Sequence, residues 1–121
     1  MPTLELTVLL KLDGVEVSGF PLVHREAVDS VQPFEYQKAT GGGYVALPTN
    51  QLATLHALVV RSLDQPVTVR LNGQSDAGVS LAAGGLLLVF DGTLNAGVAT
   101  NATVQNASGS TTTVQGVGGG T

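Results

Sequence analysis

The sequence predicts an all-β fold, specifically an antiparallel β-sandwich or barrel-like module of about eight to ten short strands. Three observations carry this prediction. Apolar and polar residues alternate in Thr3–Lys11 and in Val67–Leu71, which is the pattern of strands with one buried face. Turn-forming pairs such as Asp13-Gly14 and Asn72-Gly73 separate the apolar segments. Leu86–Phe90 is a continuous apolar run of strand length.

The first twenty residues are expected to form an opening hairpin. The apolar residues at even positions from Leu4 to Leu12 share one face of a strand, and we expect that face to be buried. The Asp13-Gly14 pair tolerates positive φ and predicts a tight turn into a short returning strand at Val15–Val17. The break at Gly19-Phe20-Pro21 ends this hairpin.

The next segment, Leu22–Lys38, gives a mixed signal. A single helical turn over Arg25–Asp29 is compatible with it, but Pro33 stops any long helix. Phe34 and Tyr36 then alternate with polar residues as in a strand. We therefore expect a loop followed by a strand.

The fold is expected to organise around the central stretch Leu55–Phe90. Four strand-like segments cover it: Thr54–Leu63, Val67–Leu71, Val79–Leu81 and Leu86–Phe90. Because the connections are short, each strand is expected to lie beside the next. The turns at Asn72-Gly73 and Gly84-Gly85 are predicted to set the strand register, and Leu86–Phe90 is expected to be buried on both faces.

The last thirty residues are small and polar, and no charged residue follows Asp91. Their remaining alternation favours a final hairpin over a disordered tail, with a turn at Asn106–Gly109 and fraying only in Val117–Thr121. Because small side chains let another backbone approach closely, this hairpin is predicted to face a neighbouring subunit. The candidate interface residues in it are Val98, Thr100, Ala102, Val104 and Val114.

Arg70 is a further interface candidate, because it lies on the polar face of a predicted strand and two residues before Asn72-Gly73. An ion pair across strands or across subunits is compatible with this position. Simple solvation is the usual state of such an arginine.

Composition excludes several classes of function. At 121 residues we expect a single domain over residues 1–121. Only 12% of residues are charged and 4% are aromatic, with no Trp, which disfavours stacking platforms for sugars or nucleic acids. A net charge of −4 with scattered basic residues disfavours binding to the phosphate backbone of nucleic acids, so we expect no nucleic-acid partner. The N-terminus is unlike a signal peptide and no run reaches membrane-spanning length, so we expect no membrane partner.

The side chains capable of chemistry are few. His24, Arg25 and Glu26 are acid and base types, but neighbours on an extended chain point to alternate faces. His56 lies in an apolar segment, where a hydrogen-bonded core or interface histidine is the usual case. The chain contains no Cys. We therefore predict no catalytic, cofactor-binding or metal-binding residue, and no enzymatic activity.

The segment LDQPVTVRLNG, followed by VSLAAGGLLLVF and NASGSTTTVQGVGGG, resembles the C-terminal half of small virion structural proteins of tailed bacteriophages. The resemblance covers roughly residues 55–121 and its motifs are structural. It implies an all-β, non-enzymatic module without a cofactor, which assembles in the bacterial cytoplasm and ends in the virion.

Within that resemblance we expect a capsid decoration (cement) protein, which binds the major capsid protein and forms a homo-oligomer, with a trimer favoured. The alternative is a tail, baseplate or fibre-associated module with a structural or host-binding role. Low charge and many short strands agree with a surface that contacts other proteins.

Overall fold

The computed structural model describes residues 2–41, 43–49, 52–71, 77–90 and 102–121, and these form twelve strands and no helix. The strands are β1 (Thr3–Val8), β2 (Lys11–Leu12), β3 (Val15–Glu16), β4 (Leu22–Ala27), β5 (Ser30–Lys38), β6 (Val45–Ala46), β7 (Leu55–Ser62), β8 (Val67–Arg70), β9 (Val79–Leu81), β10 (Leu86–Phe90), β11 (Thr103–Gln105) and β12 (Thr112–Gly120). Every pairing is antiparallel. The predicted all-β class is confirmed, and the strand number exceeds ten because β2, β3 and β6 have two residues each.

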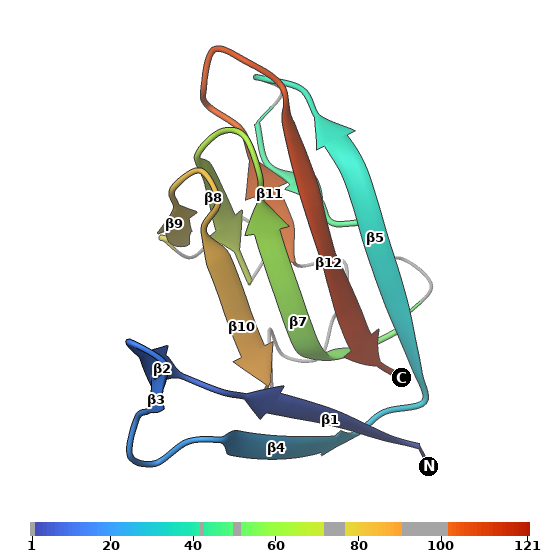
Figure 1. The fold of residues 1–121 in the computed structure, drawn as a ribbon. Helices are drawn as coiled ribbons and strands as arrows, with labels where there is room; N and C mark the ends of the chain where they lie inside the picture. The colour runs from blue at the N-terminus through green and yellow to red at the C-terminus, as the bar shows by residue number, and fades with distance from the viewer. Residues whose placement is uncertain (1, 42, 50–51, 72–76, 91–101) are drawn as a thin grey trace.

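Two four-stranded sheets form a sandwich (Figure 1). Sheet I has the strand order β10-β7-β12-β5, and sheet II has the order β6-β11-β8-β9. Two smaller sheets, β1-β4 and β2-β3, lie in the N-terminal part of the chain. We call residues 2–27, which contain both, the arm.

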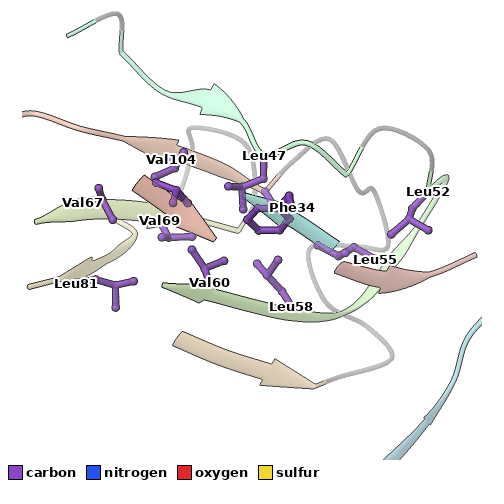
Figure 2. Close-up of a cluster of buried hydrophobic side chains, with 12 residues drawn as sticks. Phe34, Leu47, Leu52, Leu55, Leu58, Val60, Val67, Val69, Leu81 and Val104 are labelled. Atoms are coloured by element: carbon purple, nitrogen blue, oxygen red, sulfur yellow. The ribbon is translucent and has the colours of Figure 1, made fainter. Parts of the chain in front are cut away.

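The hydrophobic core fills the space between sheets I and II (Figure 2). Sheet I contributes Leu58 and Val60, and sheet II contributes Val69 and Val104, all with 0% exposure. Burying each such side chain contributes about 1.5–3 kcal/mol, so the central strands of the two sheets hold the sandwich together. The remaining core residues are Phe34, Leu47, Leu52, Leu55, Val67, Leu81, Ala102 and Val114.

Strand β12 occupies the centre of sheet I, between β7 and β5. The predicted final hairpin is therefore wrong, because β11 and β12 belong to different sheets and pair with different partners. The predicted fraying is also wrong. Pairing continues to Gly120, and the Ala53 N–H donates to the Thr121 carbonyl at 2.6 Å. The glycine run carries no side-chain periodicity, and so the sequence pattern missed a central strand.

The expectation that successive central strands lie side by side is also wrong in two places. β7 and β8 lie in different sheets, as do β9 and β10. A turn does form at Gly84-Gly85, where Gly84 has φ +78° and the Gly85 N–H donates to the Ala82 carbonyl at 2.8 Å. This turn crosses between sheets and sets no hairpin register. The Asn72-Gly73 turn lies outside the described residues, although β8 and β9 do pair as expected.

Strand β10 forms one edge of sheet I. Its side chains alternate in burial, and Leu86 and Leu88 are exposed. The expected burial of this strand on both faces is therefore wrong, because nothing among the described residues covers the outer face at these two positions. On the opposite edge, β5 accommodates Pro33, whose missing N–H is tolerated at a sheet edge.

The arm differs from the predicted opening hairpin. β1 pairs with β4, and β2 and β3 form a separate hairpin closed by Asp13 and Gly14, with φ of 51° and 80°. This confirms the predicted tight turn. The residues of Arg25–Asp29 belong to β4 and the bend into β5, so the helical turn left open there is absent. Leu12, predicted to be buried, is 72% exposed.

Candidate interaction surface

The small-residue segment predicted to face a partner lies in the core instead. Ala102, Val104 and Val114 each have 0% exposure, because β11 and β12 turn these side chains toward the space between the sheets. They are therefore core residues of a single chain, and the interface prediction is corrected for all three. Val98 and Thr100 lie outside the described residues.

Arg70 is half-buried and its guanidinium lies 4.1 Å from the centroid of the Tyr44 ring. A cation over an aromatic face is attracted by the ring quadrupole. Arg70 therefore packs within the chain and is not a simply solvated arginine of the kind that its strand position suggested.

The arm contacts the sandwich through His24. Its ring meets Phe90 of β10 edge to face, with centroids 5.7 Å apart, and its Nε2 lies 3.1 Å from Glu26 Oε2. Arg25 points to the opposite face, where its Nε donates to Glu5 Oε2 at 2.9 Å. The three residues are thus divided between two faces, as expected from an extended chain. His56 Nε2 is 3.2 Å from Thr54 Oγ1, and the described residues contain no group of three potential metal ligands.

The β2–β3 hairpin has one apolar and one polar face. Leu12 faces Val15 directly, and the Val17 N–H donates to the Leu10 carbonyl at 2.9 Å, which extends the same register. These four side chains share a face because alternate residues of paired strands point the same way. Leu10, Leu12 and Val15 are all exposed.

A groove of about 550 Å³ lies on the outer face of sheet I. The register aligns Pro33, Val117, Val59 and Leu88 in one row across the four strands. The next row contains Glu35, Gln115, Arg61 and Leu86. The groove is lined by members of these two rows together with one further residue each of β5 and β12, and it combines apolar side chains with one acid, one base and one amide: Pro33, Phe34, Glu35, Val59, Arg61, Leu86, Gln115 and Gly116.

The third row of the same outer face is Val31, Gly119, Ala57 and Phe90, and the arm covers part of it. A Cβ at Gly119 would lie 2.9 Å from a methyl group of Leu4, and Phe90 contacts His24. Ala57 is accordingly 1% exposed although it lies on the outer face. The outer face of sheet I is thus covered at one end by the β1–β4 pair of the arm and is exposed at the groove.

Buried polar side chains that were not among the candidate site residues organise the loops. Asn106 is fully buried, and its Nδ2 donates to the carbonyls of Lys38 and Ser110 at 3.0 and 2.8 Å. Ser62 and Thr112 form a second buried pair, 2.9 Å apart. Burial raises the pKa of Tyr36 to about 12, and its hydroxyl has no hydrogen-bond partner among the residues that the structure describes. None of these groups faces the groove.

Comparison with protein families, with curated proteins and with solved structures finds no significant match to this chain. In the part of the chain that the structure describes, no helix is long and apolar enough to span a bilayer.

Proposed function

We propose that this chain is a non-enzymatic structural protein of a tailed-phage virion, and specifically a capsid decoration (cement) protein. The observation that carries the proposal is the exposure of large apolar side chains on a chain with few charges. Large exposed apolar patches on a soluble domain mark contact surfaces. Twelve large apolar residues are exposed in the described part of the chain: Leu9, Leu10, Leu12, Val15, Leu22, Val23, Val31, Val45, Leu63, Val79, Leu86 and Leu88.

Half of these residues belong to the arm, which extends from the sandwich (Figure 1). The outward face of its β1–β4 segment carries Val23 beside Thr7, and the Glu5–Arg25 ion pair next to them. A mixed apolar and polar face of this kind is typical of surfaces that bind a preformed partner. We assign the contact with the major capsid protein lattice to this face.

Stabilisation of the capsid follows from mass action. A protein that binds only the assembled lattice lowers its free energy by RT ln(1 + [L]/Kd) for each occupied site. A homo-oligomer, with a trimer as the favoured state, strengthens binding further, because several arms engage the same lattice at once.

The test is the addition of purified protein to capsids that lack it. We expect saturable binding at hundreds of copies per particle and a higher capsid melting temperature. Densitometry that gives about a dozen copies or fewer in purified virions would overturn the cement role and favour the tail, baseplate or fibre alternative.

A matched pair of variants locates the contact. Val23→Asp is expected to weaken capsid binding, whereas Val79→Asp, at 40% exposure against 43% for Val23, is expected to bind as wild type. Equal binding by both variants would exclude the arm as the lattice contact. A hydrolytic activity abolished by His24→Ala, Glu26→Ala or His56→Ala in a folded protein would contradict the non-enzymatic role.

A further inference from the structure

The β2–β3 hairpin is an amphipathic sheet whose apolar face lacks cover within the described chain. Leu12 and Val15 are 72% and 69% exposed, and Leu10 lies beside them on the same face. A two-stranded hairpin is marginally stable in water unless its apolar face packs on another element. In Figure 1 the hairpin lies beyond the β10 edge of sheet I, and none of its residues lines the groove of its own chain.

The groove on sheet I is suited to a hairpin of this kind. Pro33, Val59 and Leu86 are apolar residues of its lining, and the register places Val117 and Leu88 in the same row of the sheet as Pro33 and Val59. The apolar faces of two sheets pack by interdigitating their side chains, and this arrangement needs no free hydrogen-bonding edge on either partner. Leu86 and Leu88 at the β10 side of the groove remain exposed for such a contact.

The β1–β4 pair of the arm already packs on this face of sheet I. Leu4 and His24 of the β1–β4 pair cover the row that contains Gly119 and Phe90, directly next to the apolar row of the groove. A β2–β3 hairpin placed on the groove would continue the layer that the β1–β4 pair begins. This continuity favours a segment of the same chemistry as the arm over an unrelated peptide.

The charges of the two surfaces favour one orientation of the hairpin in the groove. The hairpin carries Lys11, Asp13 and Glu16, which give it a net charge of −1, and Asp13 lies in the turn between Leu12 and Val15. The groove is lined by Glu35 on β5 and by Arg61 on β7, two strands apart in the same row, and Arg61 is exposed and forms no ion pair with the described residues. An acidic turn is attracted to the Arg61 side of the groove and repelled from the Glu35 side. An acidic turn that enters beside an available guanidinium sets the orientation of the contact.

We propose that the apolar face of the β2–β3 hairpin of one copy docks into the sheet I groove of a second copy, with Asp13 beside Arg61. The contact joins two different surfaces, so it forms a reciprocal dimer or a ring where it closes, and an open filament where it does not. The proposal concerns this chain alone and holds whether or not the protein binds a capsid.

Site-specific disulfide trapping tests the contact cleanly, because the chain contains no native Cys. Leu12→Cys and Leu86→Cys proteins, each with a different mass tag, are mixed under mild oxidation. We expect the mixed disulfide in clear excess over the one formed between Leu12→Cys and Val79→Cys, since Val79 is exposed but lies on sheet II. Equal yields in the two mixtures would show random collision and overturn the proposal.

Charge substitution supplies an independent readout. Arg61→Glu in the Leu86→Cys protein is expected to reduce the trapped fraction severalfold, because the acidic turn then meets a carboxylate. Lys11→Glu, on the polar face of the hairpin, is the control and is expected to leave the trapped fraction close to its original value. A trapped fraction unaffected by Arg61→Glu would contradict the assigned orientation and the proposed contact.

Discussion

The arm and strand β12 show opposite relations between side-chain size and burial. The arm carries Leu and Val residues with up to 72% exposure, whereas β12 ends in Gly118, Gly119 and Gly120, all of which are buried. Small residues are buried here because strands and side chains must approach closely. Large residues are exposed in the arm because no other element of the described chain covers them. Apolar content alone therefore does not identify the core of this protein.

Gly116 of β12 is the small residue whose neighbours leave the least room for a side chain. Gly116→Ala would place a Cβ 1.8 Å from the Val59 carbonyl oxygen, with the Phe34 ring 2.9 Å away, so the central sheet must shift. We expect a loss of more than about 4 kcal/mol in the free energy of unfolding, or failure to fold. Gly109→Ala, where no atom lies within 4 Å, is the matched control and should cost under about 0.5 kcal/mol by urea denaturation.

The second prediction compares one leucine from each region. Leu58→Ala leaves a cavity between the sheets and should destabilise the protein by about 2–5 kcal/mol. Leu12→Ala removes the same atoms from a side chain that is 72% exposed, and should change stability by under about 0.5 kcal/mol in dilute solution. Similar losses for the two variants would mean that the arm belongs to the cooperative core.

The third prediction concerns the buried hydroxyl of Tyr36. Tyr36→Phe removes an unpaired buried polar group and should stabilise the protein by about 1 kcal/mol near pH 7. The raised pKa of about 12 means that the folded state keeps a proton that the unfolded state releases near pH 10. Ionisation of Tyr36 therefore leaves the stability of the protein unchanged below about pH 10 and lowers it as the pH rises from about 10 to about 12.

Chemical denaturation from pH 8 to pH 12 checks the sign of this effect. The wild type and a Tyr44→Phe control should show the loss above pH 10, and Tyr36→Phe should show less of it. An identical pH dependence in all three proteins would show that Tyr36 is solvated in the folded state.

The exposed ion pair between Glu5 and Arg25 on the surface of the arm is expected to contribute little to stability. Glu5→Gln breaks the ion pair with Arg25. The Glu5 side chain is 50% exposed and the Arg25 side chain is 65% exposed. Exposed pairs of this kind contribute about 0–1 kcal/mol, and salt screens them. We expect a change in melting temperature close to the error of differential scanning calorimetry. A loss of several degrees would indicate that the arm is coupled to the sandwich far more strongly than its contacts suggest.

The sequence predicted the fold class and several strands, since the short Leu- and Val-rich run Thr54–Leu63 forms β7 and the alternating segment Val67–Leu71 forms β8. It did not predict which strands pair. A short connection such as Ala82–Gly85 serves equally for a hairpin and for a crossing between sheets, and only long-range packing decides between them. The alternation from Leu4 to Leu12 correctly indicated an amphipathic strand, but a period cannot tell what covers its apolar face.

The apolar face of the β2–β3 hairpin is proposed to be a contact surface rather than a part of the core. Light scattering coupled to size-exclusion chromatography, with a thermal melt of the same samples, compares the wild type with Leu12→Asp most directly. We expect a concentration-dependent mass above 12.3 kDa for the wild type, a monomer for the variant, and the same melting temperature for both in dilute solution. Equal masses for the two proteins, or a melting temperature several degrees lower for the variant, would show that this face is not a contact surface.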